Sequence, residues 1–170
     1  MNKKNLLLVL IFLLLGFGII YIFNQRDGGE VIEGTNEVKL YYSTKDAMYL
    51  EAEIRKIEDL SNKYKETIKE LISGPKSSEL SHTIPEGVEI LDIKIEGSRA
   101  LLNFNQALVD NHWGGSTGEI MTVYSIVNTI TQFPEIKAAR ILIEGREIET
   151  LAGHLDLSTD LTADEQLVKK

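Results

Sequence analysis

The longest apolar stretch of the chain comes near its start. Residues Leu6–Phe23 form an unbroken apolar run, preceded by Lys3 and Lys4 and followed by a polar sequence from Asn24. About 18 residues at a rise of ~1.5 Å each span roughly 27 Å, close to the ~30 Å hydrocarbon core of a bilayer. A helix at the edge of a soluble core would carry polar residues on one face, and this run has none. The pattern predicts a transmembrane helix within residues 1–23, with the lysines on the cytoplasmic side.

Two other kinds of N-terminal segment also contain an apolar run. A cleaved signal peptide would need a small-x-small site, and Gly16-Phe17-Gly18 is a poor one because five more apolar residues follow it. A lipoprotein would need a cysteine to acylate, and the chain has none, which also removes disulfides and thiolate metal sites. An uncleaved anchor is therefore preferred, followed by a flexible linker over residues 24–37 with several glycines.

The next region predicts a β-hairpin. Residues Val38–Ser43 are rich in aromatic and β-branched side chains, and residues Met48–Ile54 alternate between an apolar and a charged face. A period of two with one charged face is typical of a half-buried antiparallel strand. The apolar face, expected to meet the core, consists of Met48, Leu50, Ala52 and Ile54.

Residues Leu60–Ser73 change to helical spacing. Their apolar stripe consists of Leu60, Tyr64, Ile68, Leu71 and Ile72. Asp59 or Ser61 is suited to cap the start of this helix, and Gly74-Pro75 is suited to end it. Lysines and glutamates cover the opposite side, so the stripe predicts one buried face.

The second half repeats the order of hairpin and helix. Val88–Glu96 and Ala100–Phe104 predict a second hairpin, and a slip of the alternation at Leu91 predicts a β-bulge. A capping box formed by Ser116 and Glu119 is expected to begin a second helix. The stripe of that helix consists of Ile120, Val123, Tyr124, Val127 and Ile130. Residues 136–144 then predict a strand that turns at Gly145 into residues 147–151, and a polar, frayed tail over residues 162–170 is expected.

The fold class follows from this order of elements. Strands outnumber helices and are joined mostly by tight turns, which favours an α+β domain over a doubly wound α/β domain. We expect an antiparallel or mixed β-sheet with the two helices packed on one face. The domain is placed at residues 38–161.

Charge restricts the partners of this domain. After residue 23 the chain holds 16 basic and 26 acidic residues, a net charge of −10. Bulk electrostatics therefore disfavour nucleic acid, anionic lipid and anionic wall polymers as partners.

Five segments, taken together, resemble a known family. They occur in order as ELISGP (70–75), IPEGVEILDIKIEG (84–97), ALLNFN (100–105), IVNTITQFPEI (126–136) and ILIEGREIETLAGHLDLSTDL (141–161). The segments are similar to the GerMN domain, the sporulation and spore-germination domain of Gram-positive bacteria, over about residues 38–161. The resemblance implies an extracytoplasmic interaction domain without a shared catalytic centre, although many members are lipoproteins or carry two copies.

Two neighbouring residues are candidates for binding. Trp113, the only tryptophan, lies beside His112 in a loop with glycines on its other side. An exposed Trp113 could anchor a sugar ring or a protein partner, whereas a buried one would plug the end of the core. Asp110, His112 and Ser116 are the residue types of a hydrolytic triad, but a single short loop disfavours triad geometry. No catalytic residue is assigned.

His154 and Asp156 form a second candidate pair. They could hold a ligand or metal, or Asp156 could cap a turn while His154 packs on a sheet edge; the turn is preferred. Without cysteines or a HExxH spacing, no metal site and no cofactor are expected.

The leading hypothesis is a non-enzymatic, single-pass membrane protein whose domain lies outside the cytoplasm and binds other envelope or sporulation proteins. Peptidoglycan and a second copy of the chain are further candidate partners. The interaction surface is expected to combine Trp113 with a neighbouring sheet edge. The alternatives are a peptidoglycan-directed enzyme or accessory factor, and a ligand sensor that uses residues 105–117.

Overall fold

The computed structural model describes residues 36–170. The expected membrane helix and most of the expected linker lie outside these residues. Within residues 36–170, no helix is both long and apolar enough to cross a bilayer. The elements, in chain order, are β1 (Glu37–Thr44), β2 (Leu50–Lys56), η1 (Leu60–Asn62), α2 (Lys63–Ile72), β3 (Leu80–Ser81), β4 (Ile90–Glu96), β5 (Arg99–Phe104), α3 (Ala107–Asp110), α4 (Ser116–Ile130), β6 (Ala138–Ile143), β7 (Arg146–Glu147) and η2 (Glu165–Leu167).

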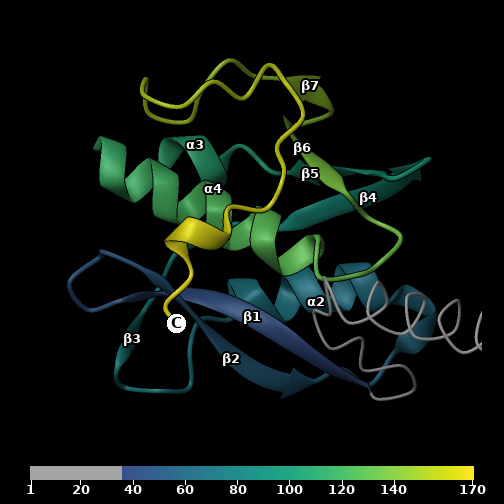
Figure 1. The fold of residues 1–170 in the computed structure, drawn as a ribbon. Helices are drawn as coiled ribbons and strands as arrows, with labels where there is room; N and C mark the ends of the chain where they lie inside the picture. The colour runs from purple at the N-terminus through teal and green to yellow at the C-terminus, as the bar shows by residue number, and fades with distance from the viewer. Residues whose placement is uncertain (1–35) are drawn as a thin grey trace, which may run out of the picture. The chain divides into compact units, whose positions relative to one another are not determined.

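The strands form two sheets, where the sequence predicted one. The first has the order β2-β1-β3 and the second β4-β5-β6-β7. Within the second sheet β5 and β6 are parallel, because the connection between them crosses over through α3 and α4. The α+β class is confirmed, but the helices do not share one face of a single sheet. Helix α4 instead contacts β1 of the first sheet and β6 of the second, and it runs between the two sheets (Figure 1).

The predicted hairpins are present. β1 pairs with β2, and β4 pairs with β5, in each case antiparallel. The register of the second hairpin shifts between Ile90 and Asp92, where Leu91 is the extra residue, which confirms the predicted bulge. β6 and β7 form the third hairpin, in which the return strand ends at Glu147 and is shorter than the strand expected over residues 147–151.

The predicted orientation of β2 is wrong. Leu50 is buried, but Ile54 and Met48 are 59% and 61% exposed. The charged face points inward instead, because Arg55 fills the space at the end of α2. Its guanidinium donates to the Glu70 carbonyl at 3.1 Å and the Ser73 hydroxyl at 2.8 Å, and it also donates to the carbonyl of Gly74. The last carbonyls of a helix lack partners within the helix, so this arginine stabilises the end of α2.

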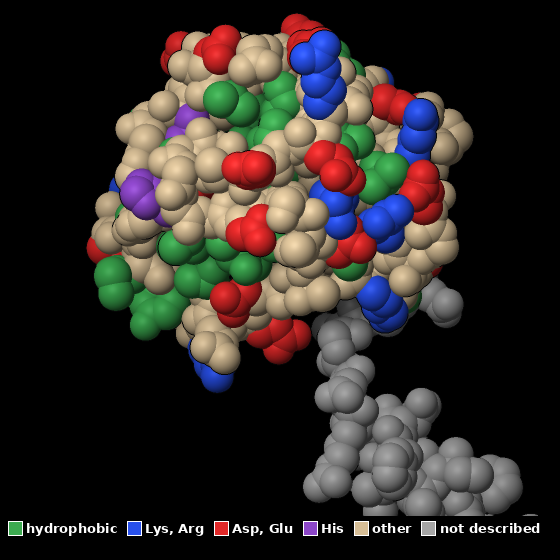
Figure 2. Space-filling view, turned by 90° about the horizontal axis from the view of Figure 1, so that it is seen from above, with side chains coloured by type: hydrophobic (Ala, Val, Ile, Leu, Met, Phe, Trp, Pro, Cys, Tyr) green, Lys and Arg blue, Asp and Glu red, His purple; other side chains and the backbone are tan. Residues whose placement is uncertain are grey.

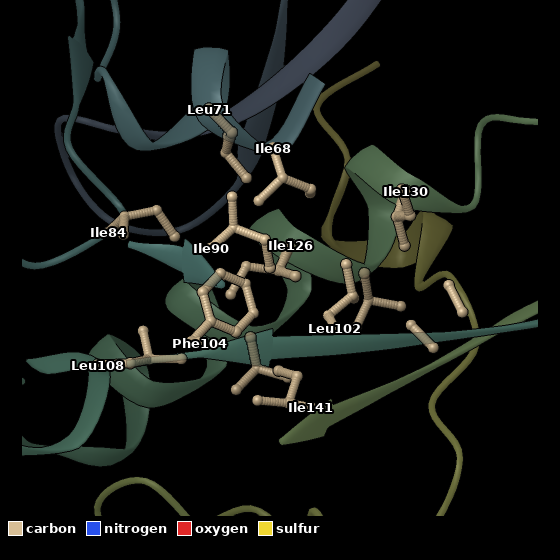
Figure 3. Close-up of a cluster of buried hydrophobic side chains, with 14 of the residues drawn as sticks. Ile68, Leu71, Ile84, Ile90, Leu102, Phe104, Leu108, Ile126, Ile130 and Ile141 are labelled. Carbon is tan, nitrogen blue, oxygen red and sulfur yellow. The ribbon is translucent and has the colours of Figure 1, made fainter. Parts of the chain in front are cut away.

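The core lies where α2, α4 and both sheets meet. Figure 3 shows Ile68 and Leu71 of α2 and Ile126 of α4 near Leu102 and Phe104 of β5. All five side chains are fully buried. Leu60 precedes α2 in η1 and is 58% exposed, so its place in the predicted stripe is wrong.

The C-terminal segment is docked rather than frayed. Leu161 exchanges two backbone hydrogen bonds with Ala139, and the Lys169 N–H donates to the Leu50 carbonyl. Between these points the Asn128 side chain bonds both backbone groups of Asp164, at 2.9 and 3.0 Å. The segment therefore pairs with β6 at Leu161 and with β2 at Lys169, so the expected fraying of residues 162–170 is wrong.

Candidate functional site

The loop before α4 holds Trp113 at the surface. Its side chain is 53% exposed, so it does not plug the core. The His112 ring stacks on the indole with 5.4 Å between centroids, and a Cβ added to Gly118 would come within 2.7 Å of the indole Nε1. Gly114 and Gly115 follow with φ of 77° and 79°, a conformation that favours glycine, and bring the chain into α4. The indole is therefore a fixed, half-exposed platform.

Hydrogen bonds hold His112 in one orientation. Its Nδ1 accepts the Gly114 N–H at 2.9 Å, and its Nε2 lies 3.2 Å from Thr122 Oγ1. The Thr122 hydroxyl donates its only hydrogen to the Thr83 carbonyl, so Nε2 is the protonated nitrogen of a neutral ring. Burial lowers the pKa of His112 below its ordinary 6.5, although the Glu119 carboxylate acts in the opposite direction. Neither ring nitrogen is left for Asp110 or Ser116, so these residues do not form a triad.

Glu119 is the functional residue that sequence reasoning assigned wrongly. It does not complete a capping box with Ser116, because the N-cap of α4 is Gly115 and no side chain caps it. The Glu119 side chain is fully buried and accepts five hydrogen bonds from one loop. The donors are the Thr150 hydroxyl and the backbone N–H groups of residues 151, 152, 154 and 155.

The charge of Glu119 is stabilised in place. Burial alone would raise its pKa, but the hydrogen bonds from Thr150 and the backbone of Ala152, His154 and Leu151 outweigh burial and hold the pKa below the ordinary value. The N–H groups approach both carboxylate oxygens at 2.8 to 3.3 Å. A carboxylate that accepts several backbone N–H bonds remains ionised at neutral pH. Glu119 thus fixes the conformation of residues 150–155.

The loop that Glu119 holds borders a shallow hollow of about 350 Å³. Its lining consists of Glu149, Thr150, Gly153, His154, Leu155, Asp156 and Ser158. The two predicted residues His154 and Asp156 therefore both line this hollow. The strand β7, which is the edge of the second sheet, leads directly into this segment.

The Asp156 carboxylate caps a turn, which confirms that part of the preferred interpretation, whereas His154 is exposed. Its Oδ1 accepts from the Ser158 hydroxyl at 2.6 Å and the Ser158 N–H at 2.8 Å. These hydrogen bonds lower the pKa of Asp156 below its ordinary value. Within residues 36–170 no group of three or more His, Asp or Glu side chains has the arrangement of a metal site.

The two pairs of candidate residues belong to one region. The Trp113 indole lies against Gly118, and the next residue, Glu119, accepts the N–H of His154 at 2.9 Å. Figure 2 views the molecule from above Figure 1, the side on which the loop after β7 lies. Histidine side chains there lie near apolar ones, and most lysine and arginine side chains in view lie on the other half. We call Trp113 together with the hollow the Trp113 surface.

The fold and this surface define an α+β domain of two sheets that presents a fixed aromatic residue beside a polar hollow. The family model described as "Sporulation and spore germination", Germane, matches residues 39–149. The chain therefore belongs to the Germane (GerMN) family, as the sequence resemblance indicated. A search among curated proteins found no match.

Solved structures share the fold. A Clostridium perfringens protein assigned provisionally as a lipoprotein is 26% identical, with a TM-score of 0.55, and the match covers 80% of this chain and 93% of that one. The first GerMN domain of the Bacillus subtilis sporulation protein GerM is 18% identical, with a TM-score of 0.63 and coverage of 76% and 98%. The tandem GerMN domains of GerM match at 22% identity and a TM-score of 0.63, covering 85% of this chain and 51% of the tandem pair.

Proposed function

We propose that the chain is a non-enzymatic interaction module, held at the membrane outside the cytoplasm, that supports a sporulation or germination assembly. One observation carries the proposal. Trp113 is 53% exposed although His112, Gly118 and the glycine turn fix its position. A rigid, half-exposed aromatic side chain costs little conformational entropy on binding and is the type of residue that dominates protein interfaces. Family membership supports the biological setting.

The membrane location rests on the apolar run Leu6–Phe23 and the lysines before it. The similar Clostridium perfringens protein, as a provisional lipoprotein, supports a place at the outer side of the membrane. We expect fractionation to recover the intact chain with membranes, and we expect protease added to protoplasts to degrade the domain. Recovery of a soluble chain that begins near Ile19 would show instead that the segment is cleaved.

The Trp113→Ala variant tests the interaction surface. Because half of the side chain is exposed, its removal should lower the free energy of unfolding by no more than roughly 2 kcal/mol, whereas a core tryptophan would cost roughly 3–5 kcal/mol. Capture of envelope partners by the full chain should fall strongly. Thermal unfolding and co-purification on the same variant measure both effects.

Leu60→Ala is the matched control, since Leu60 is another exposed apolar side chain, at 58%, in a different element. It should leave partner capture unchanged. Equal capture by the wild type and Trp113→Ala would remove Trp113 from the interface.

A peptidoglycan-directed enzyme is the alternative to consider, because two carboxylates, Glu149 and Asp156, line the hollow. Hydrolysis of a glycan needs one carboxyl group with a raised pKa to act as the acid. Hydrogen bonds from Ser158 lower the pKa of Asp156, which is the opposite shift. Asp156 is therefore unsuited to act as that acid.

A further inference from the structure

The residues of the Trp113 surface come from two segments with a one-sided charge. Residues 105–119 and 147–164 contain no lysine or arginine. Their seven acidic residues are Asp110, Glu119, Glu147, Glu149, Asp156, Asp160 and Asp164. Arg140 forms ion pairs with Glu147 and Asp160, and Arg99 also pairs with Asp160, so nearby arginines offset the charges of these two acids. Of the other acids, Glu149 and Asp156 line the hollow and Glu119 is bonded to the loop that borders it, so this surface carries an excess of negative charge.

Glu119 adds a negative charge beneath this surface. Its five hydrogen-bond donors are all neutral, and none of the ion pairs within residues 36–170 includes it. The charge is fully buried, so water screens it less than it screens the exposed carboxylates. A buried carboxylate without a cationic partner attracts positive charge toward the surface above it.

Trp113 provides a specific contact for a cationic group, in addition to the general attraction of the acidic surface for positive charge. The indole is the side chain best suited to hold an ammonium or guanidinium group over its ring. His112, which stacks on the indole, lies near enough to the Glu119 carboxylate for that charge to act on its pKa, so the aromatic platform and the buried carboxylate are in the same region. The carboxylates of Glu149 and Asp156 line the adjoining hollow.

We infer that the Trp113 surface binds a basic segment of a partner protein, with a lysine or arginine side chain over the indole and neighbouring basic or polar groups in the hollow. The inference rests on the proposed function and specifies the chemistry of the partner. The charge of the surface excludes phosphate-bearing polymers, because the same carboxylates would repel them. A flexible basic segment suits a shallow hollow better than a compact ligand, since it can follow the surface from Trp113 to Ser158.

The test uses the full chain in a non-ionic detergent and two capped synthetic peptides, hexa-arginine and hexa-glutamate. Trp113 is the only tryptophan, so its fluorescence reports directly on the proposed contact. Hexa-arginine should change this fluorescence with saturation, and added salt should weaken its binding. Hexa-glutamate should do neither. Binding of hexa-glutamate, or binding of hexa-arginine with unchanged Trp113 fluorescence, would overturn the inference.

A pair of double variants separates this surface from general attraction to an acidic domain. Glu149→Gln with Asp156→Asn removes two charges from the hollow and keeps oxygen acceptors for local hydrogen bonds. Glu58→Gln with Glu79→Gln removes two exposed charges elsewhere. Measured with labelled hexa-arginine, the first pair should weaken binding roughly five- to tenfold and the second by less than about twofold. Equal effects of the two pairs would overturn the inference. Loss of partner capture in Trp113→Ala together with no binding of hexa-arginine would refute the basic partner while leaving the interaction module standing.

Discussion

Replacement of Glu119 by alanine is expected to destabilise the domain by roughly 3–5 kcal/mol, far more than the loss of an ordinary helix cap. The variant would leave four backbone N–H groups and the Thr150 hydroxyl without their acceptor. The loop would have to open to water to satisfy them, which would also disrupt the hollow. Chemical denaturation measures the loss, and hydrogen exchange should show faster exchange at residues 151–155.

The same contact predicts a pH dependence. Because the pKa of Glu119 in the folded protein lies below its ordinary 4.5, its stabilising contribution is complete above that value and is lost as the pH falls through the folded-state pKa. Glu119→Ala should therefore show a weaker loss of stability on acidification than the wild type. Glu58→Ala is the control, an exposed acid that should change stability by less than about 0.5 kcal/mol. An equally small effect of both variants would contradict the assigned role of Glu119.

Val127→Asp is expected to prevent stable folding. Val127 is fully buried in α4, between the two sheets, so the new carboxylate would lack water and a cation. The cost should reach several kcal/mol unless the group protonates, in a domain whose total stability is typically ~5–15 kcal/mol. Soluble yield and thermal unfolding measure the outcome.

Val127→Ala is the matched control for this variant. It removes two methyl groups without adding a charge, and it should cost only about 2 kcal/mol. An unchanged thermal midpoint in Val127→Asp would show that the inner face of α4 has been placed wrongly.

Local patterns predicted the hairpins well for a physical reason. The alternation along residues 88–96, and its slip at Leu91, records directly which side chains face the core and where the ladder shifts. The direction of β2 was predicted wrongly because alternation shows only that two faces differ. Arg55 faces inward because it donates hydrogen bonds to carbonyl groups at the end of α2 that have no partner within the helix. The local pattern of β2 carries no information about this contact with a distant segment.

The candidate site was predictable in part. An isolated tryptophan beside glycines correctly drew attention to Trp113, and a histidine and an aspartate two residues apart drew attention to the hollow. Glu119 was missed as a site residue because an acid in the first turn of a helix resembles a cap. Its true partners lie 31 to 36 residues further along the chain, a separation that sequence periodicity does not report.

The most direct test of the interaction module is photocrosslinking in sporulating cells of the source organism, with a photoreactive phenylalanine analogue at position 113. The matched position is Leu60, which is exposed to a similar degree in η1. The proposal predicts a discrete crosslinked protein from position 113, absent from position 60 and obtained only from the membrane fraction. No protein adduct from position 113, or the same adducts from both positions, would contradict the proposal that the domain acts through the Trp113 surface.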